Sequence, residues 1–353
     1  ARGGNAVDAA VTAAFALAAL EPWNSGLGGV GFMVVHRAGA RAAEVVDFGP
    51  LAPAALDPGA YPLAGGGGGD LFAWPAVKDD RNVHGPLSFA VPAAVDGYGL
   101  ALERFGTFSF ADALGPAIEL AERGLPVDWF LTLRVALAAA ELRAYEATRA
   151  VWLPDGLAPA TPAGGAMRRL KLPGLARTMR RLAATGRRDF YEGEIARAIA
   201  ADAREGGAFL AADDLARYRA RIVPVLDIDY RGQVVQTTPG LTAGPTLAHA
   251  LKLVAASKLG ATPGPGAFAA YAGALKAAYA ERLSRMGEAS GAAETCTTHL
   301  SVIDQAGTMV ALTTTLLSVF GSRYLLPATG ILMNNGIMWF DPRPGRANSI
   351  APG

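Results

Sequence analysis

The sequence predicts an α+β fold with a helix-rich middle region, because strand-like segments occur at both ends of the chain and helical patterns lie between them. The strand-like runs lie near the N-terminus and in the last third of the chain, at residues 32–36, 44–48, 223–230, 234–238 and from 297 onward. Between residue 94 and about residue 220, most apolar residues recur at helical spacing, in segments that Gly and Pro separate.

Composition narrows the classes of protein that this chain can belong to. Its 353 residues suit one large domain or two ordinary ones. Lys+Arg 32 against Asp+Glu 31 leaves a net charge of +1, which argues against nucleic-acid and membrane partners. With 51% hydrophobic and 18% charged residues, the chain is not a disordered protein. Its single cysteine, Cys296, excludes an internal disulfide framework and leaves both cytoplasm and periplasm open as compartments.

The first expected element is a buried helix over residues 6–20. Asn5 is a suitable N-cap, Asp8 lies in the first turn, and Pro22 marks the end. The apolar run is interrupted by Asp8 and Thr12 and is shorter than the roughly 20 residues that a bilayer span requires. The first residues also lack the pattern of a signal peptide, so no leader is expected.

A glycine-rich loop at residues 25–31 follows this helix and precedes the strands at 32–36 and 44–48. A phosphate-binding loop needs the order strand, loop, helix, because the phosphate binds at the helix N-terminus. A nucleotide cofactor is therefore not expected. The four histidines show no metal-ligand spacing, so no metal is expected either: His36, His84, His249 and His299.

One basic cluster lies in the helical region. It admits two interpretations, an anionic partner or a solvated helix face, and the neutral chain favours the second. Its members are Arg168, Arg169, Lys171, Arg177, Arg180, Arg181, Arg187 and Arg188.

The alternation of apolar and polar residues predicts a β-hairpin near the end of the chain. Leu300 and Val302 alternate with polar residues before a turn at residues 304–307, and Val310 and Leu312 do so after it. The register of such a hairpin places Thr297 across from residues 313–315, within about one residue. Several hydroxyl groups would then converge, although threonine is also simply a common strand residue.

These residues carry a family resemblance. Residues 296–302, 313–315 and 330–335, together with 3–10 and 28–32, resemble the gamma-glutamyltransferase family and keep its order along the chain. The resemblance implies an N-terminal-nucleophile (Ntn) hydrolase with a four-layer αββα sandwich, made as a precursor that cuts itself before Thr297. Residues 1–296 would form the large-subunit portion, and residues 297–353 the N-terminal part of the small subunit.

The chemistry of this cut suits Thr297. A threonine hydroxyl is a weak nucleophile unless a base takes its proton, and a liberated α-amino group, with a pKa of about 7.7–8.0, can be that base. In the precursor, Thr297 would attack the carbonyl of Cys296. By resemblance, Thr315 orients the nucleophile. Cys296 is a weaker candidate nucleophile, because it would leave with the large fragment, and His299 is expected to be structural because no carboxylate partner is evident.

The resemblance breaks down at the positions that hold a glutamyl head group. Where the family has an arginine, an asparagine, a glutamine or glutamate, and an aspartate, this chain has Gly49, Leu317, Gly336 and Trp339. Each lost charge-assisted contact is typically worth about 1.5–3 kcal/mol. We therefore expect a small non-glutamyl amide substrate such as oxamate. The expected substrate-binding residues are Gly49, Thr313, Leu317, Asn335, Gly336 and Trp339.

Two alternatives remain at this stage. The chain could be a genuine gamma-glutamyl transpeptidase or glutathione hydrolase with head-group ligands from other positions, or an unprocessed, catalytically silent binding protein. The expected partners are a small-molecule amide and the self-derived large and small subunits, with a homodimer of processed heterodimers left open. The glycine pair of the family's oxyanion hole lies beyond residue 353, so the chain is expected to be incomplete at its C-terminus.

Overall fold

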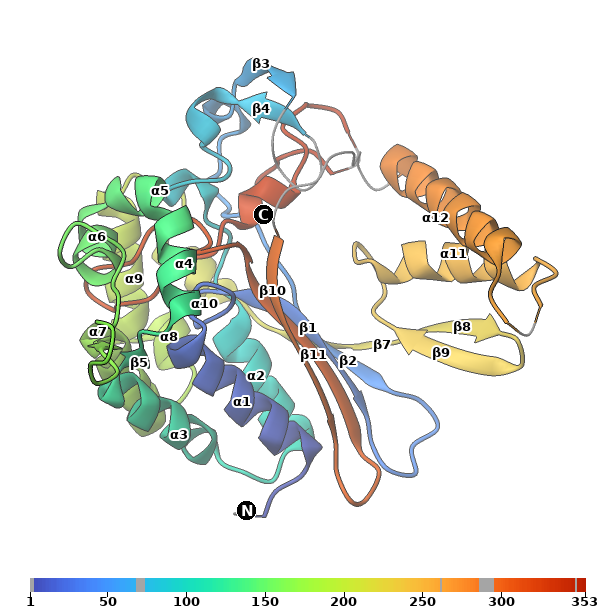
Figure 1. The fold of residues 1–353 in the computed structure, drawn as a ribbon, viewed down its shortest axis with the longest axis horizontal. Coiled ribbons are helices and arrows are strands. Elements are labelled where there is room, and N and C mark those ends of the chain that lie inside the picture. The colour runs from blue at the N-terminus through green and yellow to red at the C-terminus, as the bar shows by residue number, and fades with distance from the viewer. Residues whose placement is uncertain (1–2, 68–73, 261, 286–294, 347) are drawn as a thin grey trace.

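A five-stranded antiparallel sheet joins the two ends of the chain in the computed structural model, which describes residues 3–67, 74–260, 262–285, 295–346 and 348–353. Its strand order is β10-β11-β1-β2-β7. The strands are β1 (Val30–His36), β2 (Glu44–Phe48), β7 (Arg221–Pro224), β10 (Thr295–Ile303) and β11 (Met309–Ser318). The N-terminal strand β1 pairs with β11 from the last part of the chain, with Val30 opposite Thr315 and Phe32 opposite Thr313 (Figure 1).

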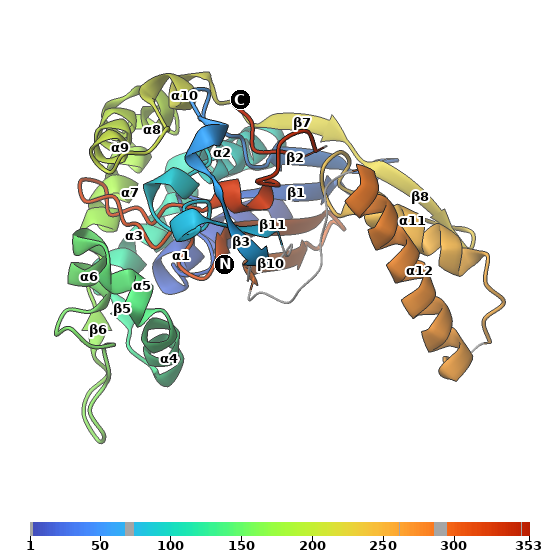
Figure 2. The same ribbon diagram turned by 90° about the horizontal axis from the view of Figure 1, so that it is seen from above.

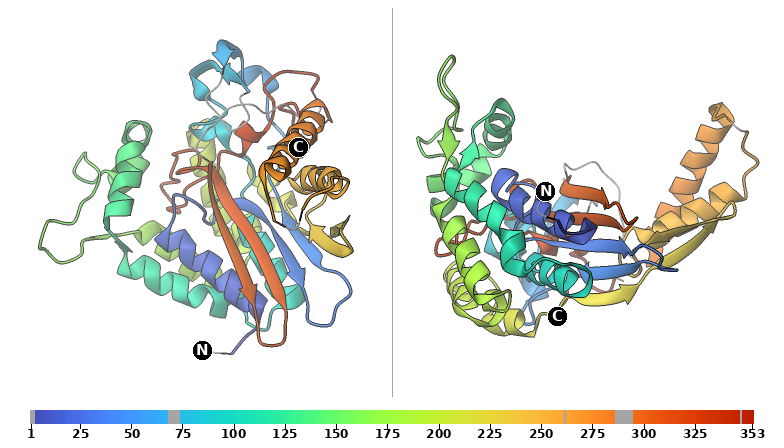
Figure 3. Two further views of the ribbon diagram at one scale, coloured as in Figure 1. Left: turned by 45° about the vertical axis from the view of Figure 1, so that its right-hand side comes forward. Right: turned by 90° about the horizontal axis from the view of Figure 1, so that it is seen from below.

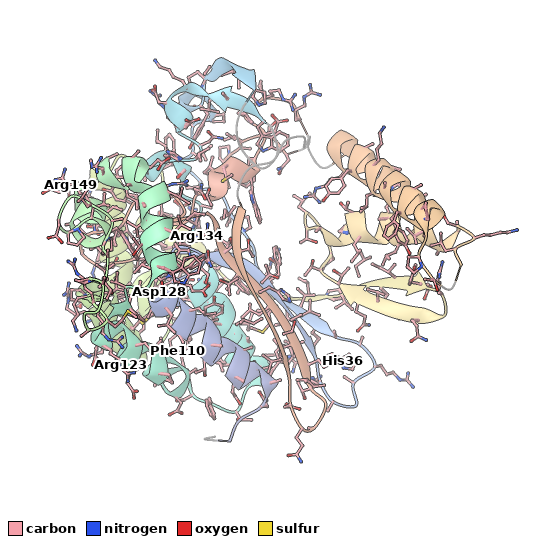
Figure 4. The ribbon with its side chains drawn as sticks, in the orientation of Figure 1. His36, Phe110, Arg123, Asp128, Arg134 and Arg149 are labelled. Atoms are coloured by element: carbon pink, nitrogen blue, oxygen red, sulfur yellow. The ribbon has the colours of Figure 1, made fainter. Side chains whose placement is uncertain are left out.

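Two helices cover one face of this sheet. Helix α1 (Ala6–Leu20) packs on β10 and β11, and helix α2 (Ala94–Phe105) packs on β1, β2 and α1 (Figure 3). Helix α3 (Phe110–Arg123) lies against α1, and Phe110 and Arg123 mark its two ends in Figure 4. The rings of Phe110 and Phe15 meet edge-on at 5.5 Å. The main hydrophobic core therefore lies between the sheet and these helices.

The helix-rich middle region is confirmed, with one difference. Its further helices are α4 (Trp129–Leu137), α5 (Ala139–Arg143), α6 (Glu146–Trp152), α7 (Pro173–Thr185), α8 (Asp189–Glu192), α9 (Glu194–Glu205) and α10 (Ala212–Arg217). The helical pattern of residues 131–145 forms two short helices that meet at Ala138 rather than one. Short strand pairs β3 (Leu63–Gly67) with β4 (Pro75–Val77), and β5 (Leu125–Pro126) with β6 (Arg169–Leu170), lie outside the main sheet.

A separate arm extends beyond β7 on the side away from helices α4–α9 (Figure 2). It consists of the hairpin β8 (Leu226–Tyr230) and β9 (Gln233–Thr237) with helices α11 (Gly244–Ala255) and α12 (Pro265–Arg285). The strand-like run at residues 223–230 is thus divided, because β7 joins the main sheet while β8 begins the hairpin of the arm. None of the helices in the described ranges is long and apolar enough to cross a membrane.

The start of α1 is fixed by a capping box and by the hairpin at the other end of the chain. The Asn5 side chain accepts hydrogen bonds from the N–H groups of Val7 and Asp8, and Asp8 accepts one from the N–H of Asn5. Burial raises the pKa of Asp8, but donors on Phe108, Thr107 and Asn5 outweigh it and leave the pKa below its ordinary value. Asp304, in the turn between β10 and β11, accepts from the N–H of Ala6 at 3.0 Å.

The glycine loop allows close approach of backbones. A Cβ at Gly28 would lie 2.3 Å from the carbonyl oxygen of Leu332, and one at Gly31 would lie 2.2 Å from that of Thr313. A Cβ at Gly29 would lie 2.7 Å from the carbonyl oxygen of Thr315. Side chains at Gly29 and Gly31 would push β11 away, and one at Gly28 would push away the segment at Leu332, so the glycines act in packing rather than in phosphate binding.

The basic cluster is largely paired within the chain. Five of its members form ion pairs with carboxylates: Arg168, Arg180, Arg181, Arg187 and Arg188. The most buried partner is Asp96 of α2, only 3% exposed, which pairs with both Arg187 and Arg188. These contacts favour the interpretation as a solvated, internally neutralised helix face.

Residues 83–85 form hydrogen bonds with the segment that follows β11. The carbonyl of Val83 accepts a hydrogen bond from the Asn335 side chain at 3.0 Å, and Gly85 donates its N–H to the Ser322 carbonyl at 2.8 Å. Burial and the nearby Arg323 guanidinium lower the pKa of His84 to about 4, although Glu141 and Asp80 oppose this. His84 is therefore neutral at physiological pH.

We expect Gly31→Ala to lower the free energy of unfolding by about 2–3 kcal/mol, because the added methyl group overlaps the Thr313 carbonyl. Urea titration measures the change. The matched control is Gly115→Ala in α3, where an added Cβ meets nothing within 4 Å and helix propensity should add about 0.5–1 kcal/mol. Equal stabilities for Gly31→Ala and the wild type would contradict the packing role of the loop.

Acidification should weaken the fold through His84. Between its ordinary pKa of 6.5 and its folded pKa of about 4, the unfolded chain binds a proton that the folded chain does not. Stability from this residue is intact above pH 6.5 and decreases by about 3 kcal/mol as the pH falls to 4. Urea titrations of the wild type and His84→Gln across this range measure the effect, and parallel pH profiles would refute it.

Candidate active site

Thr297 lies at a β-bulge in the edge strand β10. The ladder between β10 and β11 pairs Cys296 with Leu317 and Thr298 with Thr314, so its register shifts at Thr297. The Thr297 side chain is exposed, and its Oγ1 donates to Oγ1 of Thr315 at 3.2 Å. The predicted hairpin is confirmed, with its turn closed by the hydrogen bond from the Gly307 N–H to the Asp304 carbonyl. The backbone of Cys296 lies in β10, while its side chain lies outside the described part of the chain.

Thr315 is a buried acceptor beside the candidate nucleophile. It is 2% exposed, and its Oγ1 also accepts the backbone N–H of Leu317 at 2.8 Å. The same oxygen therefore receives two donors, one from Thr297 and one from two residues further along its own strand. Leu317 has a φ of 81°, which is rare for a bulky residue.

The two faces of the hairpin separate its hydroxyl groups. Thr314 and Thr298 face the helices, where the Thr314 hydroxyl contacts the Tyr98 hydroxyl at 2.7 Å and Thr298 accepts from Ser25 at 3.2 Å. Burial raises the pKa of Tyr98, so its hydroxyl stays protonated. Since neighbouring residues of a strand point to opposite faces, Thr313 and Thr315 lie on the other face, with Thr297. The convergence of hydroxyls that the hairpin predicted is thus limited to this second group.

His299 bridges the two strands next to this site. Its Nδ1 contacts the Thr313 hydroxyl at 2.8 Å, and its Nε2 contacts the Ser301 hydroxyl at 3.2 Å. Both ring nitrogens therefore have hydroxyl partners, which matches the expected structural role and gives no sign of a catalytic triad.

Asn334 and Asn335 are fully buried, and their side chains hold the backbone segments next to the site through hydrogen bonds. The Asn335 side chain accepts from the N–H of Ser318 at 3.2 Å and donates to the Ser318 hydroxyl and the Val83 carbonyl. The Asn334 side chain connects Gly28, Ala90 and Gly336. Because the Asn335 amide is used in these contacts, its clearest function in the structure is to hold the residue that follows Leu317.

The positions that lack the family's polar ligands are filled by apolar groups. A Cβ at Gly49 would lie 2.7 Å from Cζ of Phe32, and a Cβ at Gly336 would lie 2.3 Å from the Cβ of Ala90. The side chain of Leu317 is 1% exposed and belongs to the main core. Trp339 is half-buried against the same core. Any side chain larger than a hydrogen atom at Gly49 or Gly336 would therefore require the neighbouring groups to move.

Sequence reasoning missed several residues around the candidate active site. Phe32 and Ala90 occupy the space at the two glycines, and Ser25 and Tyr98 bind the hydroxyls on the helical face. Ser25 precedes the glycine loop, which gave some indication of its place, whereas Tyr98 is indistinguishable from an ordinary core residue in α2. The left-handed backbone of Leu317 had no sequence signal either, since leucine does not favour it. Among the described residues, no cluster of three His, Cys, Asp or Glu could hold a metal.

Comparisons with known proteins place the chain in a family. The family model described as gamma-glutamyltranspeptidase matches residues 1–296 and 286–353. The Acylase ACY 1 proenzyme of Pseudomonas sp. (strain V22) is 32% identical over 389 residues, covering 99% of this chain and 68% of that relative. The glutathione hydrolase proenzyme of Bacillus subtilis (strain 168) is 27% identical over 407 residues, covering 99% of this chain and 67% of that relative.

Solved structures give the same result. The cephalosporin acylase from Bacillus halodurans has a TM-score of 0.85 at 26% identity, covering 99% of this chain and 68% of that one. The gamma-glutamyltranspeptidase of Helicobacter pylori has a TM-score of 0.70 at 26% identity, covering 81% of this chain and 79% of that one. These likenesses confirm the α+β fold of the Ntn-hydrolases. Both curated relatives are named as proenzymes. The chain therefore belongs to the gamma-glutamyltranspeptidase family of hydrolases and acyltransferases.

Proposed function

We propose that this chain is an autoprocessing threonine amidohydrolase with Thr297 as its nucleophile. The observation that carries the proposal is the hydrogen bond from Thr297 Oγ1 to Thr315 Oγ1 at a bulge in β10. The bulge takes the peptide bond between Cys296 and Thr297 out of the regular ladder, and the exposed Thr297 side chain is accessible to water. Family membership makes an enzyme the better interpretation than a silent binding protein.

Processing would begin with attack of the Thr297 oxygen on the carbonyl carbon of Cys296. The C–N bond between the two residues breaks, the hydroxyl proton of Thr297 passes to the nitrogen, which becomes the new α-amino group, and an ester joins Cys296 to the Thr297 oxygen. Water then hydrolyses the ester, which leaves a carboxylate on Cys296 and a free hydroxyl on Thr297. The cut would divide the protein into a large subunit that ends at residue 296 and a small subunit that begins at residue 297.

Catalysis by the mature enzyme would reuse the same oxygen. The α-amino group of Thr297 takes the hydroxyl proton as the oxygen attacks the substrate amide, and it returns a proton to the leaving amine. The acyl group remains on Thr297 as an ester until water or an acceptor amine releases it. Thr315 supports both steps by holding the Thr297 oxygen in place.

The substrate would be an amide without a glutamyl head group. Phe32 fills the space at Gly49, Ala90 fills the space at Gly336, and the side chain of Leu317 is buried in the core. None of these groups can bind a carboxylate or an ammonium group. The similarity to acylases supports a non-glutamyl acyl group. A small planar amide such as oxamate is our first candidate, and glutathione hydrolysis, which the similarity to glutathione hydrolases favours, is the alternative.

Thr297→Ala should stop processing, because it removes the attacking oxygen. Intact-mass measurement should find two fragments of the wild type and one uncut chain of the variant. Edman sequencing of the smaller wild-type fragment should begin Thr-Thr-His. Thr185→Ala, at an exposed position on α7, is the matched control and should be cut like the wild type. Cleavage of Thr297→Ala at the same bond would rule out this nucleophile.

The wild type should hydrolyse γ-glutamyl-p-nitroanilide slowly. A variant with an arginine at position 49 and enough space for its side chain should hydrolyse this compound faster. Phe32→Ala combined with Gly49→Arg should raise kcat/KM for this compound at least tenfold, since one charge-assisted contact contributes about 1.5–3 kcal/mol. Oxamate hydrolysis, followed by ammonia release, should be faster than glutamyl turnover in the wild type.

The single variants are the controls for this experiment. Gly49→Arg alone should give little gain, because the Phe32 ring occupies the position of its side chain, and Phe32→Ala alone supplies no charge. Rapid glutamyl turnover by the wild type would instead support the glutathione hydrolase alternative.

A further inference from the structure

We propose that Leu317 is a positioning residue, whose N–H fixes the Thr315 hydroxyl that holds Thr297, while its left-handed φ lets the chain continue to the anchored Ser318 without moving that N–H. This inference rests on the proposed role of Thr297 and concerns how its oxygen is aligned. It assigns to Leu317 a function of its backbone amide, in place of a contact between its side chain and the substrate.

The first observation is the backbone conformation of Leu317. Its φ of 81° lies in the left-handed region, where the Cβ of an L-residue crowds the following carbonyl oxygen. The N–H of Leu317 donates to the Thr315 hydroxyl at 2.8 Å, and Ser318 is anchored on the other side of the residue. A residue that avoids positive φ would therefore have to move its N–H in order to reach Ser318. Such conformations cluster at functional sites, where the surrounding contacts maintain them.

The second observation is that contacts on both sides of Leu317 hold it in this conformation. The residue before it, Leu316, donates its N–H to the Asn24 carbonyl and accepts from the N–H of Asn335. The residue after it, Ser318, is held by the Asn335 side chain through two hydrogen bonds. The Leu317 side chain itself is 1% exposed in the main core. The left-handed backbone of Leu317 is therefore held by contacts of the residue before it, of the residue after it and of its own side chain.

Two further non-glycine residues with left-handed backbones follow in the same segment. Phe320 has a φ of 60°, donates its N–H to the Trp23 carbonyl at 2.8 Å, and packs its ring against Trp152. Arg323 also has a φ of 60°, and its carbonyl accepts from the Thr148 hydroxyl at 2.9 Å. The whole turn after β11 is thus bound to neighbouring elements, and Leu317 is the member of it that contacts Thr315.

These contacts determine the orientation of two hydroxyl groups. A hydroxyl oxygen accepts through two lone pairs, and those of Thr315 receive the N–H of Leu317 and the O–H of Thr297. The Thr315 oxygen is held between these two donors, and its hydrogen bond to Thr297 fixes the position of the Thr297 oxygen. When the Thr297 oxygen attacks a carbonyl carbon, its proton leaves Thr315 for the nitrogen that acts as its acceptor, while Thr315 keeps the oxygen in place.

The test compares Leu317→Gly with Leu317→Val. Glycine adopts the left-handed region freely and keeps the N–H, but it loses the buried side chain. Valine keeps most of the apolar volume, but its β-branch resists positive φ. We expect the rate of processing for Leu317→Gly to stay within threefold of the wild type despite a lower melting temperature. Leu317→Val should process at least tenfold more slowly, with kcat for amide turnover falling and KM unchanged.

A packing role for Leu317 gives the opposite order, because valine then outperforms glycine in both melting temperature and rate. That order would overturn the proposal. If Leu317→Val does not fold, Leu317→Asn and Leu317→Thr repeat the comparison, because asparagine tolerates the left-handed region and threonine is β-branched. The asparagine variant should again stay within threefold of the wild type, and the threonine variant should be at least tenfold slower than the wild type.

Removal of the acceptor provides a second test. In a Thr315→Val background, Leu317→Gly and Leu317→Val should differ less than twofold, because the N–H has lost its partner. A persistent tenfold difference would contradict the role of this hydrogen bond. Arg231→Gly is the matched control, since Arg231 has a φ of 52° in the turn between β8 and β9, and its relief from strain should leave processing unchanged.

Failure of this inference is distinguishable from failure of the proposed function. If Thr297→Ala is still cut at the same bond, the nucleophile is wrong, and the inference falls with it. If Thr297→Ala is uncut while the rates of the Leu317 variants follow their melting temperatures, the nucleophile stands and only the positioning role is refuted.

Discussion

The antiparallel pairing of β1 with β11 is the constraint on which the rest of the structure depends. It joins the two ends of the chain in one sheet, and it requires the backbones to approach more closely than side chains at Gly29 and Gly31 would allow. Because Thr315 lies opposite Val30 in this pairing, the glycine loop also sets the place of the residue that holds Thr297. A motif that resembles a ligand-binding loop thus acts through packing.

The division of the sheet into two faces explains how a row of threonines can serve two purposes. Thr298 and Thr314 bind Ser25 and Tyr98 on the side of the helices, where they anchor the strands to the core. Thr297 and Thr315 lie on the other face, where their hydroxyl groups form a hydrogen bond. The bulge at Thr297 accompanies this arrangement, since the register of the ladder shifts there, next to the anchored Thr298.

Local patterns in the sequence predicted those parts of the structure that local interactions determine. Helix α1 begins after Asn5 because of its capping box, and the hairpin follows from alternating residues around the turn at Asp304. The family resemblance then predicted roles for Thr297 and Thr315, whose hydroxyl groups form a hydrogen bond in the structure. The sequence did not predict that Phe32 fills the space at Gly49, because this contact joins two strands through tertiary packing. The left-handed backbone of Leu317 was also unpredictable, since it is imposed by Asn335 and Asn24 against the preference of leucine.

Asp304 binds the first helix from the far end of the hairpin, well removed from the bond that we propose is cut. After the cut, the two fragments would therefore stay associated, held by the hydrogen bonds between the strands of the sheet and by the hydrogen bond between Asp304 and Ala6. Refolding of the cut protein would differ from refolding of the uncut chain, because two separate polypeptides must associate before β1 and β11 can pair. Refolding would then be a second-order process whose rate depends on protein concentration. The lifetime of the mature form would therefore depend on the rate at which it unfolds and its fragments dissociate.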